Sequence, residues 1–356
     1  MKSTEPNMYS LKNSILFILI LAVTSGINGV NAQGDPDTTE NIEELRQKLK
    51  SESFNMGALI LTQADFAFDK DAAAGNRGFT VPQVRFILNG NLDGGFSYKI
   101  QADFADQFTL LDAEIGYELS EKATVIVGSQ QPGISAEFLT GPHKIDFYTR
   151  SYPVVALAQE RDFGIRLAGD LTDVVNYSVG MFNGNGLAPN NDNNFYYAGR
   201  LGFTADKSET GQIEGGVNLS YGEMTNTTIA GGVLPNIDGD RFTYGGDVRY
   251  EDENLILAAE VLAANLEYTG FTESDNVYGF HLTGGYKFDQ RSTVMARYET
   301  LQSDLLGTGI DRDRVLIGYK GNPTTETGFR INYLMPLNNN AEFKDHGLVM
   351  TMHIGF

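Results

Sequence analysis

The chain has 356 residues, a formal net charge of −20 at pH 7 and no cysteine. These numbers exclude a disulfide framework and a nucleic-acid partner, because binding phosphate backbones needs a basic footprint. Glycine reaches 40 residues, and phenylalanine and tyrosine reach 22 and 17, a composition typical of many strands and turns.

The first residues follow the charged, apolar and small-residue order of a secretory signal. Lys2 and Lys12 precede the apolar run 15–23, and the triplet VNA ends at Ala32. The run is too short to span a bilayer, which takes about 20 residues. We therefore expect a signal peptide over 1–32, cut after Ala32, with an uncleaved anchor as the alternative.

Residues 33–55 are expected to form a periplasmic leader with one short helix over 38–50. Ile42, Leu45 and Leu49 fall on one helical face of that stretch. The helix either plugs the periplasmic mouth or contacts a partner, or it is a short frayed leader. It is too short for a stable coiled coil.

From residue 56 onward the apolar period becomes two, which indicates strands. In GGFSYKIQADF, Phe96 and Ile100 share one face, whereas Lys99 and Asp103 share the other. About sixteen such segments recur, a number within the range of membrane barrels. They lie near 56–68, 79–92, 95–105, 109–119, 122–131, 161–170, 174–182, 195–204, 212–222, 241–250, 254–264, 277–288, 292–302, 313–320, 327–336 and 347–356.

The connections alternate in length, which separates two interpretations. A soluble sandwich buries its apolar face and needs no such alternation. A membrane barrel turns its apolar face to lipid and has short periplasmic turns and long outer loops. The long connections are expected at 69–78, 132–160, 183–194, 223–240, 265–276, 303–312 and 337–346. We predict an all-β fold, a transmembrane antiparallel β-barrel of about 16 strands over 56–356, preceded by the short helix.

The last strand explains how the barrel would close. Leu348, Met350, Met352, Ile354 and Phe356 alternate with small or polar residues. Every backbone group inside a bilayer needs a partner, so the last strand must pair with the first. The terminal Phe356 resembles the sorting signal that bacterial outer-membrane assembly machinery reads.

Charges on the predicted inner face are nearly balanced, so the expected wall is not a basic ladder. The inward cations are Arg85, Lys99, Arg166, Arg200, Arg241, Arg249, Lys287, Arg297, Arg314, Lys320 and Arg330. The inward acids are Asp65, Asp103, Asp112, Glu114, Glu118, Asp162, Glu214, Asp247, Glu260 and Glu299. The arginines either form a transverse field that selects anions or pair with these acids.

Several stretches in order resemble the family of phosphate-selective porins O and P. They are LLDAEIGYEL (110–119), VIVGSQQPGISAEFLT (125–140), RDFGIRLAGD (161–170), VGMFNGNG (179–186) and AGRLGF (198–203). The chain has Gln130 and Gln131 where the family often places a lysine before the proline, and QVRF offers only Arg85 where members often carry several arginines. The resemblance implies a sixteen-stranded, usually trimeric, outer-membrane porin. It also implies that the third outer loop, here 132–160, folds into the lumen as a constriction.

These expectations converge on passive diffusion of small hydrophilic solutes through a pore narrowed by loop 132–160, with a preference for anions such as phosphate. The expected partners are the lipid bilayer, the assembly machinery, small solutes or anions, and further copies of the chain in a homotrimer. The candidate contacts for anions at the constriction are His143, Lys144, Arg150, Arg161, Arg166, Arg85 and Arg200.

Two other classes of function remain open. An outer-membrane hydrolase would use His281 or His353, which have inward parity, together with a serine on a neighbouring strand. A closed structural or adhesion barrel would carry no current. The four histidines show no metal-binding spacing, and we expect no cofactor, no metal and no catalytic residues.

Overall fold

The computed structural model describes residues 50–356 except 52, 72–74, 208–210, 308–309 and 339–340. The chain divides into two units, Met1–Leu49 and Lys50–Phe356, and the described residues belong to the second. The expected signal peptide 1–32 and the expected helix 38–50 lie outside the described residues, except for Lys50. That residue belongs to the two-residue strand β1 (Lys50–Ser51), which pairs with β2.

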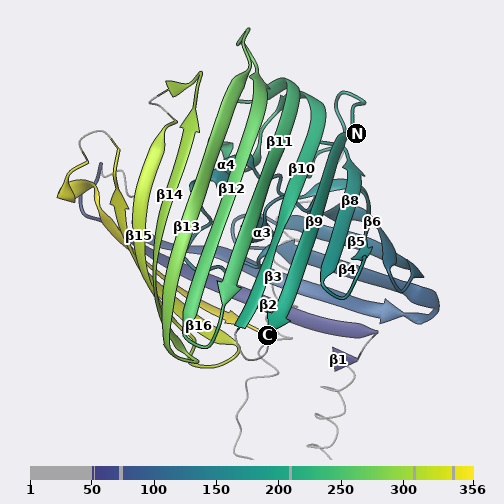
Figure 1. Cartoon of the computed structure of the whole chain (residues 1–356), viewed down its shortest axis with the longest axis horizontal. Helices are drawn as coiled ribbons and strands as arrows, with labels where there is room; N and C mark the ends of the chain where they lie inside the picture. Colours follow the sequence, from purple (N-terminus) through teal and green to yellow (C-terminus); the bar gives the residue numbers. More distant parts are fainter. Residues whose placement is uncertain (1–49, 52, 72–74, 208–210, 308–309, 339–340) are drawn as a thin grey trace, which may run out of the picture. The chain divides into compact units, whose positions relative to one another are not determined.

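Sixteen longer strands, all antiparallel to their neighbours, form one closed barrel in the described chain (Figure 1). They are β2 (Phe54–Ala67), β3 (Arg77–Leu92), β4 (Phe96–Asp103), β5 (Thr109–Ser120), β6 (Ala123–Gln130), β7 (Asp162–Asp170), β8 (Val175–Phe182), β9 (Tyr196–Lys207), β10 (Gly211–Thr227), β11 (Ile237–Glu251), β12 (Leu255–Tyr268), β13 (Asp275–Asp289), β14 (Ser292–Ser303), β15 (Arg312–Gly321), β16 (Thr327–Pro336) and β17 (Gly347–Gly355). Each corresponds to one predicted segment, so the predicted barrel is confirmed.

The barrel closes between its last and first long strands, β17 and β2. Leu348 pairs with Phe66 and Ile354 with Ile60. Beyond the ladder, the Phe356 N–H donates to the Ala58 carbonyl at 3.0 Å, and the Ala58 N–H donates back at 2.9 Å. Closure removes the sheet edge that a bilayer cannot satisfy.

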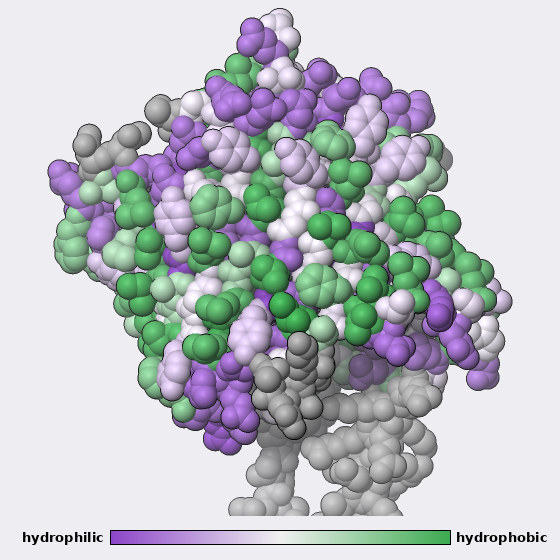
Figure 2. Space-filling model, viewed as in Figure 1, coloured by the Kyte–Doolittle hydropathy of each residue, from purple (hydrophilic) through white to green (hydrophobic). Residues whose placement is uncertain are grey.

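Side chains alternate between the two faces of the wall as the sequence predicts. Phe96, Ile100 and Val127 are 42–50% exposed on the outside, whereas Arg241 and Arg297 are at most 2% exposed within. On the face that Figure 2 shows, an apolar belt crosses the middle, with hydrophilic residues above it and at its lower edge. The belt matches a hydrocarbon layer flanked by water.

Two outer connections are shorter than expected, because the strands continue past the apolar belt. Strand β10 reaches Thr227, which still pairs with Ile237, and β12 reaches Tyr268. The predictions of long loops over 223–240 and 265–276 are therefore wrong in extent. Alternation of apolar residues stops where lipid ends, but backbone pairing continues into water and leaves no such signal.

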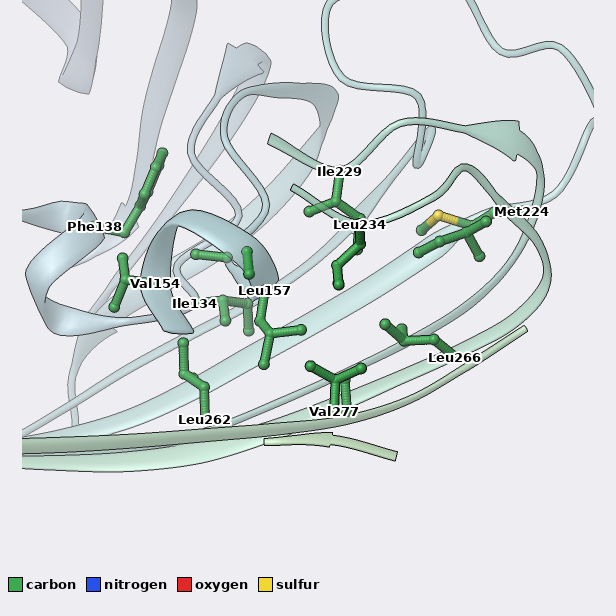
Figure 3. Packing of buried hydrophobic residues seen from close by; sticks show 14 of the residues in the cluster. Ile134, Phe138, Val154, Leu157, Met224, Ile229, Leu234, Leu262, Leu266 and Val277 are labelled. Atoms are coloured by element: carbon green, nitrogen blue, oxygen red, sulfur yellow. The ribbon is translucent and has the colours of Figure 1, made fainter. Parts of the chain in front are cut away.

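The connection between β6 and β7 folds into the barrel and carries two short helices, α3 (Ala136–Leu139) and α4 (Tyr152–Leu157) (Figure 1). Apolar side chains of this loop pack against inward aliphatic residues of the wall, among them Leu262, Leu266 and Val277 (Figure 3). This part of the inner wall is therefore apolar, because the loop packs against it. No helix in the described part of the chain is long and apolar enough to cross a membrane.

Two further short turns of 3-10 helix, η1 (Asp93–Gly95) and η4 (Phe343–Asp345), sit in the connections after β3 and before β17. A third, η2 (Ala230–Gly232), lies between β10 and β11 and contacts α4. This contact ties the outer end of the hairpin to the constricting loop.

Candidate pore constriction

Local sequence shapes the inward loop at both of its helices. Ser135 caps α3, since its hydroxyl accepts the Phe138 N–H at 3.0 Å, as N-cap serines commonly do. Pro153 stands in the first turn of α4, where its missing N–H costs nothing. The remaining residues of α4 are apolar, and Val154 and Leu157 are fully buried.

Ion pairs, one buried and one half-buried, then bind the loop to the wall of β11–β14. Glu137 of the loop accepts from Arg297 at 2.6 Å. Asp146 accepts from both terminal nitrogens of Arg249, at 2.8 and 3.3 Å. Charge-assisted contacts of this geometry are about twice as strong as neutral hydrogen bonds, so these two pairs fix the loop across the lumen.

Side chains of the wall also form hydrogen bonds with the loop, mostly with its main chain. Arg241 donates to the Leu157 carbonyl at 2.8 Å and to the Gln159 side chain at 2.6 Å. The N–H groups of Glu137 and Tyr152 donate to Glu260 and Glu299 at 3.1 and 3.3 Å. Arg241, Glu260 and Glu299, which parity places on the inner face, therefore hold the loop.

The wall side chains around the loop shift the pKa values of its carboxyl groups. Burial acts to raise the pKa of Glu137, but Arg297, His281 and the Ser151 N–H favour the carboxylate, so the pKa lies below its ordinary value of 4.5. The pKa of Asp146 is likewise lowered despite its burial, chiefly by Arg249. Both carboxylates are thus ionised at neutral pH.

Arg150 braces the loop from within. Its guanidinium donates to the carbonyls of Glu137, Phe138 and Thr140 at 3.2, 3.1 and 2.8 Å. Burial lowers its pKa to about 10, so the side chain stays charged at pH 7.

A second group of charged residues lies along β3–β7 and includes two of the predicted contacts. Arg85 pairs with Asp103 at 3.2 Å, and Arg161 pairs with Asp112 at 3.0 Å. Lys99 joins the same Asp112 at 2.7 Å. Each of these cations thus has a carboxylate partner.

The other two predicted wall arginines also have protein partners. Arg166 donates to the Gln130 side chain at 2.8 Å, so the glutamine that departs from the family pattern has a local role. Arg200 lies on β9 and forms a bidentate pair with Asp247 at 2.5 and 2.9 Å.

His143 and Lys144 occupy a turn of the loop that faces β15–β17. The His143 ring lies 5.8 Å from the ring of His353, and Lys144 is exposed. Lys320 and Arg330 contact the same turn. The two-residue alternation predicts that Lys320 and Arg330 point inward. Nothing in the sequence connects these two residues to a turn that lies about 180 residues earlier in the chain.

A cavity of about 390 Å³ remains open between the loop and the wall of β9–β14. Side chains of both signs line it, including Lys144, Arg200, Glu214 and Asp247. Polar lining of this kind can hydrate a small solute beside the loop.

The surroundings of His281 differ from those that the hydrolase alternative requires. The His281 Nε2 atom lies 3.9 Å from Glu137 and 3.8 Å from Glu260. Its Nδ1 atom is 3.5 Å from the Thr283 hydroxyl, which also accepts from Arg297. A serine next to the imidazole is needed for a Ser-His arrangement, and the described contacts of His281 are to carboxylates and a threonine.

A closed antiparallel barrel with a lipid-facing belt, a charged inner wall and a loop anchored across its lumen is the architecture of an outer-membrane channel. The family model for phosphate-selective porin O and P matches residues 55–300. The chain belongs to this family and is a porin of the bacterial outer membrane.

Solved porin structures share the fold at low sequence identity. An anion-selective porin from Comamonas acidovorans has 14% identity and a TM-score of 0.62, covering 85% of this chain and 99% of that chain. OprB of Pseudomonas putida has 11% identity and a TM-score of 0.63, covering 89% and 97%. OmpT of Vibrio cholerae, in its trimer form, has 13% identity and a TM-score of 0.59, covering 85% and 99%. Comparison with curated protein sequences finds no match.

Proposed function

We propose that this porin passes small hydrophilic solutes by passive diffusion and prefers anions of the phosphate class. The observation that carries the proposal is the loop 131–161, which Arg297 and Arg249 anchor and whose Lys144 lines the cavity beside the loop. The wall carries balanced charge, so the loop is the element that gives the constriction its sign. The family description and the anion-selective relative support the same preference.

Reversal potential in a planar bilayer tests this proposal. We expect purified protein to give discrete single-channel currents in potassium chloride. Under a salt gradient, the potential should have the sign of chloride preference. A cation preference would reject the anion proposal while leaving the pore intact, and the lack of any current would reject the channel itself.

We also propose that the porin assembles as a homotrimer after export through the signal peptide 1–32. The trimeric relative supports the oligomer, and the charge and apolar order of the first residues supports the signal. Phe356 is proposed to be read by the outer-membrane assembly machinery. Its side chain is 67% exposed, although its backbone is paired with Ala58. Native electrophoresis, N-terminal sequencing and Phe356→Ala expression would test the three parts separately.

A further inference from the structure

Most of the charged side chains around the cavity beside the loop neutralise one another. The cavity has a volume of about 390 Å³, and residues of the loop and of the strands β8–β14 line it. Three ion pairs lie in its lining, with nitrogen–oxygen distances of 2.6, 2.8 and 2.5 Å: Arg297 with Glu137, Arg249 with Asp146, and Arg200 with Asp247. Their charges cancel, so the character of the cavity depends on the charged groups that remain.

Two exposed side chains of opposite sign remain in this lining. Lys144 comes from the loop, and Glu214 comes from β10 on the wall. Neither side chain forms an ion pair or a hydrogen bond within the described part of the chain. Both charges are therefore open to a solute that enters the cavity.

The anchor between Arg249 and Asp146 explains why these two charges are left over. Glu214 lies directly opposite Arg249 in the β10–β11 ladder, a position in which opposite charges commonly pair. Arg249 instead binds Asp146 at 2.8 and 3.3 Å and Glu251 at 2.8 Å. Asp146, two residues after Lys144, is occupied by the same arginine. One ion pair thus leaves a cation on the loop and an acid on the wall, on either side of itself.

A buried carboxylate strengthens the negative side of the cavity. Glu260 lines the cavity, is 3% exposed and forms no ion pair with a lysine or arginine of the described residues. Its Oε2 atom accepts the Glu137 N–H at 3.1 Å, whereas its Oε1 atom has no hydrogen-bond partner there. A buried charge without a cation is unfavourable, so a positive group in the cavity is stabilised by Glu260 even without direct contact.

The signs and positions of these groups select the charge of the solute that fits. An anion is attracted by Lys144, but inside the cavity it also meets Glu214 and Glu260. A cation is attracted by the two acids and repelled by Lys144. Repulsion of this kind discriminates against the wrong ligand, whereas a molecule with one group of each sign is attracted at both ends.

We propose that this cavity binds a small zwitterionic solute of the amino-acid class, with its carboxylate at Lys144 and its ammonium group at Glu214. The inference rests on the proposed passage of small hydrophilic solutes, and it adds a class of solute to the anions.

Block of potassium chloride current by γ-aminobutyrate tests the site in the full-length protein at pH 7. We expect γ-aminobutyrate to reduce the wild-type single-channel current in a saturable way. Butyrate and butylammonium have the same carbon chain with one charge each, and at equal concentration they should give little block. Glu214→Gln and Lys144→Gln should each raise the half-blocking concentration of γ-aminobutyrate about fivefold, because each removes one partly solvated ion pair.

Matched substitutions outside the cavity control for a general change in pore charge. Glu118 is an exposed acid that parity places on the inner face of β5, and Lys287 is bound by Glu251 at 2.6 Å. Neither residue lines the cavity. Glu118→Gln and Lys287→Gln should leave the half-blocking concentration unchanged. Because Glu214 and Lys144 are both exposed, their variants should still insert and conduct, and each variant is compared with its own current without solute.

The outcomes separate this inference from the function on which it rests. Equal block by butyrate would show a simple anion site, and equal block by butylammonium a simple cation site; either result would overturn the proposal. Wild-type half-blocking concentrations in both Glu214→Gln and Lys144→Gln would place the zwitterion elsewhere and overturn the assigned residues. In each of these cases the channel still conducts and its reversal potential still reports the anion preference, whereas loss of all current in wild-type protein would reject the channel itself.

Discussion

Partners of the inner-wall cations divide them into three groups. Arg241, Arg249 and Arg297 hold the constricting loop. Lys99 and Arg161 share Asp112 of β5. At the loop turn, Lys144, Lys320 and Arg330 form no ion pair with any carboxylate of the described residues. A near balance of inward charges therefore conceals one local excess of positive charge, and the excess lies where the pore is narrowed.

Glu137→Gln is expected to loosen the loop, because Arg297 then keeps only its longer contact with Glu299 of the wall, at 3.6 Å. Breaking a buried pair from one side costs about 3–5 kcal/mol. We expect a lower free energy of unfolding by that order and larger, noisier single-channel current, measured by denaturant titration and planar bilayer recording. Glu342→Gln is the control, since its pair with Lys344 is exposed on an outer loop, where a pair contributes about 0–1 kcal/mol. Equal effects of both substitutions would contradict the anchoring role.

Acid should release the loop only at low pH. Although burial acts to raise the pKa of Glu137, the pKa is lowered in the folded protein below 4.5, chiefly by Arg297. The pair's contribution to stability is therefore complete above the unfolded pKa and is lost as pH falls through the lowered folded value. We expect constant conductance from pH 7 to about pH 5 and an increase below pH 4.5, measured at constant salt. An increase confined to the range between pH 7 and pH 5 would assign the anchoring to other groups.

Among the elements, the constricting loop is unusual because it has a small apolar core inside a water-filled barrel. Helix α4 buries Val154 and Leu157 against Leu262 and Leu301 of the wall. Burial of each large aliphatic side chain contributes about 1.5–3 kcal/mol. The ion pairs orient the loop, and this apolar contact holds α4 close to the wall.

Leu157→Asp should detach α4 from the wall without opening the barrel. A charge placed in a dry contact without a partner is strongly unfavourable. We expect the single-channel conductance to rise, whereas far-ultraviolet circular dichroism should still report a β-barrel. Leu187→Asp, at an exposed position on another outer loop, should leave conductance unchanged. Unchanged conductance in Leu157→Asp would show that α4 does not hold the constriction.

At the scale of the whole molecule, the barrel is a boundary between two solvents. Its outer face is apolar where lipid surrounds it, and its inner face combines charged residues with the dry contact for the loop. Closure through β17 and β2 satisfies the backbone on both edges. Stability should therefore depend on the depth at which an outward side chain lies.

Val261→Arg and Leu255→Arg test that dependence on one strand. Both side chains point outward from β12, but Val261 lies mid-strand and Leu255 lies at its first residue, near the short turn. Arginine facing lipid costs about 2–4 kcal/mol at the bilayer midplane and about 0–1 kcal/mol near the interface. We expect that difference in the free energy of unfolding measured in lipid vesicles, and equal costs would contradict the assigned orientation.

Strand number, inside and outside faces, and the inward loop were accessible from the sequence, because each leaves a pattern of period two or an unusual connection length. Sequence did not indicate that Leu262 and Leu301 face inward to meet a loop. It also left Arg85 and Arg166 as candidates for anion contacts without showing that Asp103 and Gln130 hold them. Those contacts join residues on different strands, and parity gives orientation but no partner.

Alternation along each strand determined by itself that this chain forms a barrel, because side chains two residues apart must meet the same solvent. Tertiary structure alone decided which charges hold the loop and which remain available. The turn at 143–145 contacts Lys320 and Arg330 only in the closed barrel. Because these residues lie far apart in the chain, no local sequence pattern predicts the contact. The sign of the charge at the constriction depends on that contact.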